Sequence, residues 1–180
     1  SLSVVTGPSA RDTVLNDRVL RHLPLATLDE AALGRPIETW KNWMRHQTYD
    51  EYWRSVDHRE IYEHVDVPML QQGGWFDAYP GSTLRQWQGL RERAATPLAR
   101  ANQRVLIGPW SHEEESGRSI GDLDFGPEAE SVVREHELRF YDHWLKGLDT
   151  GLGDEPPISL FTMGTNTWRQ VAQWPLPKPL

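Results

Sequence analysis

The stretch Gly73-Gly74-Trp75-Phe76-Asp77 ends one short extended segment, and the stretch Ile107-Gly108-Pro109-Trp110-Ser111-His112 ends another. Each segment is predicted to be a strand that runs into a glycine-containing turn. The first turn presents the carboxylate of Asp77, and the second presents the imidazole of His112. Residues 82–93, between the two, have apolar positions at helical spacing. The order strand, helix, strand predicts a βαβ unit with parallel strands, and therefore an α/β fold.

The two strand ends are expected to lie at one edge of the sheet. The predicted strands cover residues 67–71 and 104–107, and ligands bind at the carboxyl ends of strands in open parallel sheets. A hydrogen bond between Asp77 and His112 would fix the imidazole tautomer and stabilise the imidazolium. Taken alone, Asp77 is as consistent with an N-cap of the next helix, and His112 with a loop residue without a role. The spacing of the pair favours a functional site.

Composition narrows the classes of function. The 180 residues suffice for one domain with a core, and they carry 26 Asp and Glu against 19 Lys and Arg, with no basic run. We therefore expect no nucleic-acid partner. Cysteine is absent, which excludes disulfides and a cysteine nucleophile. No apolar run reaches the roughly 20 residues of a membrane span, and no export signal is visible, so we expect no membrane contact and a cytoplasmic location.

The rest of the chain divides into a helical part and a β-part. Residues 1–64 carry helical patterns only, and residues 128–146 predict a longer helix. Residues 147–157, rich in Gly, Asp and Pro, are typical of a linker. Residues 158–163 and 168–171 then predict two strands. Because an isolated hairpin is only marginally stable, these strands indicate the start of an all-β domain.

Ser119 lies in a sequence that matches the G-x-S-x-G pattern of a nucleophile elbow. That elbow requires a buried strand before the serine and a helix directly after it. The residues before it are Glu113-Glu114-Glu115-Ser116, which do not form a buried strand, and Ser119 follows His112 in the chain. We therefore do not expect Ser119 to be a nucleophile.

Two further clusters favour structural roles. His136 and His143 lie two helical turns apart with acidic neighbours, but a solvated helix face explains them better than a metal site. We therefore predict neither a metal nor a cofactor. The side chains of Trp40, Trp43 and Trp53 are more consistent with helix packing than with a binding platform.

Several short sequence motifs occur in the same order in a known group of enzymes. They are Tyr49-Asp50-Glu51-Tyr52-Trp53, Gly73-Gly74-Trp75-Phe76-Asp77, Leu106-Ile107-Gly108-Pro109-Trp110-Ser111-His112, Gly121-Asp122-Leu123-Asp124-Phe125-Gly126, Phe140-Tyr141-Asp142-His143-Trp144-Leu145-Lys146-Gly147, Leu160-Phe161-Thr162-Met163-Gly164, Trp168-Arg169 and Trp174-Pro175-Leu176-Pro177. On these motifs the chain resembles the cocaine esterase / X-Pro dipeptidyl-peptidase group of α/β-hydrolases, over roughly residues 35–180.

The resemblance implies three parts. Residues 1–64 would be a helical cap segment, residues 65–150 the C-terminal part of an α/β-hydrolase core with a parallel sheet, and residues 156–180 the start of a jelly-roll β-domain. It also implies that Asp77 is the acid and His112 the general base of a Ser-His-Asp triad.

The resemblance further places Tyr79 where members of the group line the acyl pocket. The family's serine and oxyanion donor lie upstream of the cap and are absent from this sequence. Ala78-Tyr79-Pro80 stands where amino-ester-cleaving members carry acidic residues that hold a substrate ammonium, which argues against that specificity.

We therefore expect a fragment of a serine hydrolase that cleaves small acyl esters or X-Pro-type peptides. Alone it should be inactive, because loss of the nucleophile from a comparable triad costs on the order of a million-fold. The alternative is a non-catalytic module that pairs, for example as a homo-oligomer, through an exposed sheet edge.

Overall fold

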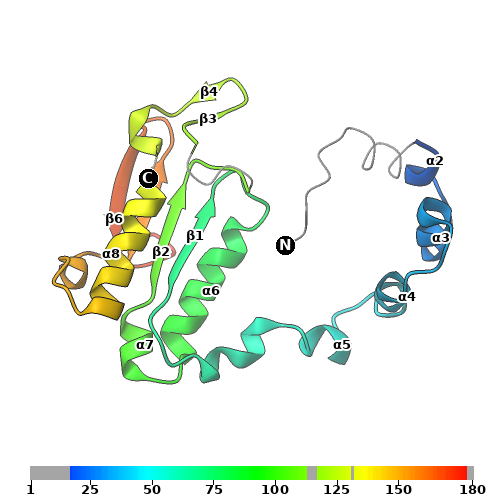
Figure 1. Ribbon diagram of the computed structural model, residues 1–180, viewed down its shortest axis with the longest axis horizontal. Helices are drawn as coiled ribbons and strands as arrows, with labels where there is room; N and C mark the ends of the chain where they lie inside the picture. The colour runs from blue at the N-terminus through cyan, green and yellow to red at the C-terminus, as the bar shows by residue number, and fades with distance from the viewer. Residues whose placement is uncertain (1–16, 113–116, 131, 178–180) are drawn as a thin grey trace. The chain divides into compact units, whose positions relative to one another are not determined.

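The computed structural model describes residues 17–112, 117–130 and 132–177 (Figure 1). The chain forms two compact units, one ending at Asp57 and the other beginning at His58. Asp77 and His112 therefore both belong to the second unit.

The first unit is helical in its described part. Its elements are α2 (Asp17–Leu20), the 3-10 helix η1 (Leu25–Thr27), α3 (Leu28–Leu33), α4 (Glu38–Arg45) and α5 (Glu51–Arg54). The side chain of Asp50 caps α5 by accepting a hydrogen bond from the amide of Tyr52 (3.1 Å), and Gly34 ends α3 with a φ of 70°. The helical prediction is confirmed for residues 17–57, which contain no strand.

Side chains of α4 hold the short helices of this unit together. The ammonium of Lys41 donates to the carboxylates of Asp29 (3.1 Å) and Glu30 (2.7 Å) on α3. The rings of Trp40 and Trp43 pack against each other with centroids 6.5 Å apart. The indole of Trp40 also donates from Nε1 to the carbonyl of Leu25 in η1 (2.9 Å), and Trp43 packs on Trp53 of α5 with ring centroids 6.3 Å apart, so both indoles contact other helices of the unit.

The second unit is built on a four-stranded sheet. Its strands are β1 (Leu70–Gly74), β2 (Arg104–Gly108), β5 (Ile158–Thr162) and β6 (Thr167–Val171), in the order β1-β2-β5-β6. The first three are parallel, and β6 returns antiparallel to β5. The register of β1 and β2 runs from Leu70 opposite Arg104 to Gly74 opposite Gly108, so the two strands end level with each other.

Helices cover both faces of this sheet. The remaining elements of the unit are η2 (His58–His64), α6 (Pro80–Arg93), α7 (Pro97–Ala101), β3 (Ser119–Ile120), β4 (Leu123–Asp124), η3 (Pro127–Ala129), α8 (Val132–Lys146) and η4 (Leu152–Asp154). Because strand side chains alternate between faces, Val105 and Ile107 pack against α6, whereas Leu106 lies on the face of α8. Gln72 of β1 also donates to Glu137 of α8 (3.0 Å), and Figure 1 shows α6 and α8 on either side of β1 and β2.

The predicted βαβ unit is confirmed, with shifted boundaries. Strand β1 includes Gly73 and Gly74 because both continue the ladder with β2, whereas the sequence predicted a strand over 67–71. Helix α6 begins at Pro80, which suits the first turn of a helix, rather than at Ser82. The short helix α7, between α6 and β2, was not predicted.

The last two strands extend the same sheet. Ile158 and Leu160 of β5 lie opposite Val105 and Ile107 of β2 in the ladder. The four side chains share one hydrophobic core. Four successive residues of β5 are buried, as in a strand that is covered on both faces. The α/β class and the mostly parallel sheet are thus confirmed. The jelly-roll domain expected from residue 156 onward is not confirmed in the described residues.

Candidate active site

The chain segments that follow β1 and β2 remain bonded to each other beyond the ends of the strands. The amide of Trp75 donates to the carbonyl of Gly108 (2.8 Å), and the amide of Phe76 donates to the carbonyl of Trp110 (3.0 Å). These two bonds carry the strand pairing forward to the residues that precede Asp77 and His112. The two reactive side chains therefore leave adjacent, mutually fixed segments.

Asp77 sits in a tight turn between β1 and α6. Its amide donates to the carbonyl of Gly74 (3.1 Å), and its Oδ1 accepts from the amide of Tyr79 (3.1 Å). The residue at the N-cap position of α6 is Tyr79, so Asp77 is not the N-cap of that helix. Its side chain is only 8% exposed, and Oδ2 remains available to a partner outside the turn.

That partner is His112. Its Nδ1 lies 3.2 Å from Oδ2 of Asp77, and the imidazole is 67% exposed. An ionised carboxylate only accepts hydrogen bonds, so this contact requires the tautomer in which Nδ1 carries the proton and donates it. Among the residues that the structure describes, no other side chain or backbone group is hydrogen-bonded to this imidazole. Among those residues Nε2 therefore has no partner, and in this tautomer it is the ring nitrogen that can accept a hydrogen bond.

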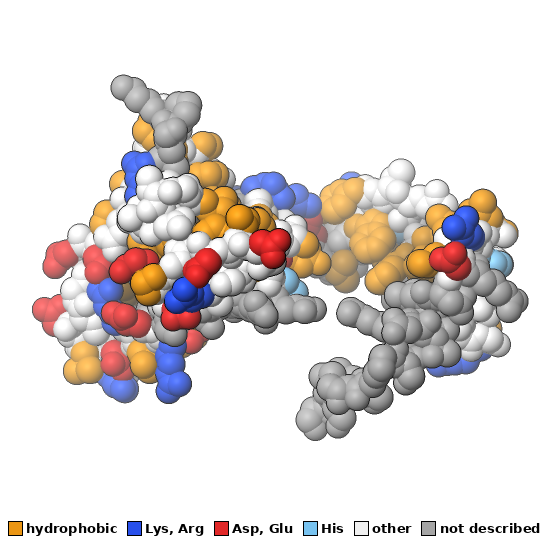
Figure 2. Space-filling view, turned by 90° about the horizontal axis from the view of Figure 1, so that it is seen from above, with side chains coloured by type: hydrophobic (Ala, Val, Ile, Leu, Met, Phe, Trp, Pro, Cys, Tyr) orange, Lys and Arg blue, Asp and Glu red, His pale blue; other side chains and the backbone are white. Residues whose placement is uncertain are grey.

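Tyr79 joins the same group. Its ring centroid lies 5.7 Å from that of His112, with an interplanar angle of 73°, and the residue is 58% exposed. Figure 2 looks from above onto the end of the second unit at which β1 and β2 finish, and hydrophobic side chains gather on that face. Phe76, next to Asp77, is also partly exposed and packs on Phe125 at 5.7 Å. The ring of Tyr79 thus contacts the Asp–His pair, and Phe76 adds a partly exposed aromatic residue next to Asp77 in the chain.

Trp110 fixes the spacing of the two segments, a role that the sequence did not predict. The residue is 1% exposed, and its Nε1 donates to the carbonyl of Ala129 (2.9 Å). A Cβ on Gly108 would overlap its indole, and a Cβ on Gly74 would overlap its carbonyl group. Both strands therefore end in glycine because Trp110 approaches their backbones closely. The motif Gly108-Pro109-Trp110 was the sequence feature from which this role could have been predicted.

Ser119 lies in β3, which turns directly into the antiparallel strand β4. No helix follows it, so it does not occupy a nucleophile elbow. His136 and His143 both lie on α8, but both are half-buried, so the expected solvated helix face is wrong for them. Burial, together with the nearby Arg139, lowers the pKa of His136. Across the described ranges, no group of three His, Asp or Glu side chains is placed to hold a metal ion.

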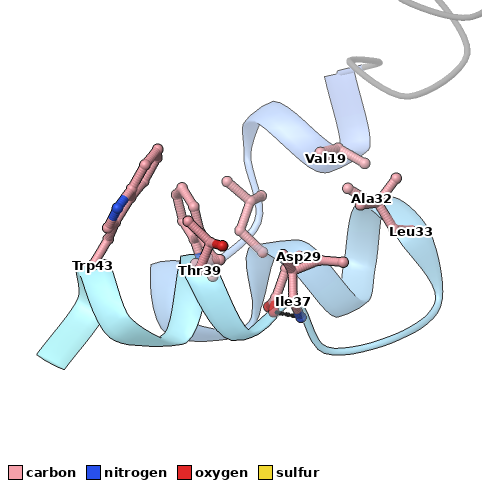
Figure 3. A pocket seen from close by; sticks show the side chains of 9 residues that line it. Val19, Asp29, Ala32, Leu33, Ile37, Thr39 and Trp43 are labelled. Atoms are coloured by element: carbon pink, nitrogen blue, oxygen red, sulfur yellow. Dashed lines mark hydrogen bonds between the residues drawn. The ribbon is translucent and has the colours of Figure 1, made fainter.

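The first unit contains an apolar cavity of about 280 Å³ (Figure 3). Val19, Leu33, Ile37 and Trp43 are among its lining residues. The carboxylate of Asp29 accepts from the amide of Ile37 (2.7 Å) and is paired with Lys41, so the lining residues that the structure describes offer no free carboxylate. Within the described residues, no helix is long and apolar enough to cross a membrane.

Comparison with known proteins identifies a family whose sequences match this chain. Residues 5–114 match the X-Pro dipeptidyl-peptidase family (S15 family). The chain is 33% identical to cocaine esterase of Rhodococcus sp. (strain MB1 Bresler) over 160 residues, which is 86% of this chain and 26% of that protein.

Two solved structures have the same fold over 84% of this chain. An aminopeptidase from the marine sediment archaeon Thaumarchaeota archaeon superimposes with a TM-score of 0.68 at 27% identity. An α-amino acid ester hydrolase superimposes with a TM-score of 0.65 at 20% identity. The match covers 25% of each of those chains, so the present chain spans about a quarter of the length of the relatives it matches.

Proposed function

The chain belongs to the X-Pro dipeptidyl-peptidase family, and on that basis we propose that it supplies the acid and the base of a Ser-His-Asp triad in a serine hydrolase. The observation that carries the proposal is the hydrogen bond between Nδ1 of His112 and Oδ2 of Asp77. It leaves Nε2 as the acceptor, the state that a general base requires before it takes a proton.

The proposed reaction follows from that geometry. A serine from a part of the hydrolase outside these 180 residues attacks the acyl carbonyl, and its hydroxyl proton passes to Nε2 of His112. Asp77 stabilises the imidazolium through Nδ1–H. The imidazolium then protonates the leaving alcohol or amine, and water releases the acyl group by the same steps. Asp77 suits this role because it is nearly buried and already oriented by its turn.

The sequence after Asp77 bears on the substrate. Ala78, Tyr79 and Pro80 carry no negative charge, so this segment offers no carboxylate to a substrate ammonium. Exposed aromatic rings at Phe76 and Tyr79 instead present apolar surface. We propose that the substrate is a small acyl ester with an uncharged acyl part rather than an X-Pro-type peptide with a free amino terminus.

A fluorophosphonate probe tests the proposal that the nucleophilic serine lies outside these 180 residues. The 180-residue chain should remain unlabelled, because no serine among the described residues is hydrogen-bonded to the imidazole of His112. The hydrolase that contains the chain should be labelled at one serine, and His112→Ala should abolish that labelling. Labelling of the isolated chain at Ser119 would contradict the proposal.

The outer edge of β1 supports a second candidate, a module that pairs through its sheet. Met69 and Trp75 form their backbone bonds with β2, so the alternate residues Leu70 and Gln72 direct their backbone groups outward. No charged residue or proline protects this edge. A concentration-dependent dimer that Gln72→Pro dissociates would favour this candidate, and a monomer in sizing chromatography would exclude it.

A further inference from the structure

Two contacts hold the imidazole of His112 in the described part of the chain. One is the hydrogen bond to Asp77, and the other is the edge-to-face contact with the ring of Tyr79. The imidazole is 67% exposed, so apart from the contact with Tyr79 little packing restricts its rotation. A single hydrogen bond at 3.2 Å permits the ring to turn about its side-chain torsions, because Nδ1 can stay near the carboxylate while Nε2 moves.

Tyr79 is rigidly attached to the fold. Its amide donates to Oδ1 of Asp77 (3.1 Å), the same carboxylate that binds His112. Its carbonyl accepts from the amides of Ser82 (2.9 Å) and Thr83 (3.0 Å) in the first turn of α6. The backbone of Tyr79 is therefore bonded on both sides, and its ring projects from a fixed point toward the imidazole.

We infer that Tyr79 is a positioning residue for His112: its ring restricts the imidazole to the orientation in which Nδ1 meets Asp77 and Nε2 faces the open side. This inference rests on the proposed function of the Asp–His pair. It differs from the sequence-based expectation that Tyr79 lines the acyl pocket, because the contact in the structure is with the base. An edge-to-face arrangement is a favoured geometry for two aromatic rings, so the contact selects one orientation.

Nuclear magnetic resonance on the 180-residue chain tests the contact without any need for activity. Ring protons of His112 should show the ring-current shift of Tyr79, and three-bond couplings should report a single side-chain rotamer. Tyr79→Leu and Tyr79→Thr should remove the shift and average the couplings, whereas Tyr79→Phe should retain both. Couplings of a single rotamer in both non-aromatic variants would overturn the inference.

Tyr141 provides a matched control on α8. It is 53% exposed and makes its own edge-to-face contact, with Phe140 at 5.7 Å, away from the site. Tyr141→Leu should leave the resonances of His112 unchanged. A change as large as that in Tyr79→Leu would show a general loosening of the fold and would overturn the specific role of Tyr79.

Kinetics of the hydrolase that contains this chain separate positioning from substrate binding. Tyr79→Leu should lower kcat about tenfold or more with little change in KM, since small misplacements of reacting groups cost up to ~10²-fold. Tyr79→Phe should recover most of that loss. A rise in KM at unchanged kcat would instead support the acyl-pocket role and overturn the inference. If His112→Ala retains activity in the same assay, the proposed function itself fails.

Discussion

The amide of Phe76 donates to the carbonyl of Trp110 at 3.0 Å, one residue before the acid and two residues before the histidine. This bond joins the segments that follow β1 and β2 at the point where the sheet ladder has ended. Because Trp110 is itself buried and bonded to Ala129, the bond transmits a fixed spacing to the Asp–His pair. The stability of the site should therefore depend on residues that take no part in chemistry.

Gly108→Ala should destabilise the second unit. The new Cβ would overlap the indole of Trp110, a ring that cannot move without losing its buried hydrogen bond. Overpacking of this kind costs about 1–3 kcal/mol. Urea unfolding measures the change. Gly153→Ala is the matched control, because nothing lies within 4 Å of the Cβ it would add, and its unfolding midpoint should stay near that of the wild type.

Trp110→Phe should also destabilise the unit, through a different cause. Phenylalanine keeps most of the buried ring but removes the donor to the carbonyl of Ala129, which then lacks a partner in the interior. An unsatisfied buried group costs about 1–3 kcal/mol. Urea unfolding followed by circular dichroism would reveal the loss, and an unchanged free energy of unfolding would show that the bond does not contribute.

The neutral imidazole of His112 should be protonated at Nδ1. The carboxylate of Asp77 accepts from that atom and so favours this tautomer over the one with the proton on Nε2. Nitrogen-15 chemical shifts of the ring distinguish the two tautomers. In Asp77→Asn the preference should weaken or reverse, since the amide can donate as well as accept. An Nε2-protonated ring in the wild type would contradict the arrangement.

The first unit should loosen in acid through Asp29. Burial acts to raise the pKa of this carboxyl, but hydrogen bonds from the amide of Ile37 and the ammonium of Lys41 outweigh it and hold the pKa below its usual value. A pKa lowered by folding stabilises the unit above the unfolded value of about 3.9, and that stability is lost as the pH falls through the folded value.

The amide of Ile37 reports this change directly. Its chemical shift and its protection from hydrogen exchange should fall together as Asp29 is protonated, whereas in Asp29→Asn both should be independent of pH over the same interval. Protection that persists in the wild type at full protonation of the carboxyl would show that the hydrogen bond does not hold the unit together.

The βαβ unit and the Asp–His pair could be predicted because both depend on local patterns. Strand and helix periodicities are separated by glycine, and a parallel crossover places two strand ends at one edge. The close approach of Trp110 to Gly74 and Gly108 could not be predicted, since it depends on a distant contact with Ala129. The glycines indicated a turn, whereas in the structure they are the last residues of β1 and β2.

The pairing of the last strands with β2 could not be predicted, for a related reason. A run of buried residues such as Ile158 to Phe161 fits an interior strand of any sheet, and the sequence does not state which sheet. The Gly- and Pro-rich segment before it favoured a new domain. In the structure, β5 continues the parallel ladder of β2. For Tyr79 the family resemblance implied a place in the acyl pocket, whereas its contact with His112 could be seen only in the structure.

The most direct test of the proposed Asp–His assignment is the hydrolysis of a p-nitrophenyl ester by the proposed full-length hydrolase. His112→Ala should reduce kcat on the order of 10⁶-fold and Asp77→Asn by about 10⁴-fold, as for comparable triads. His64→Ala, at an exposed histidine at the end of η2, should retain the wild-type rate. Near-normal turnover by His112→Ala would contradict the assignment of this pair as base and acid.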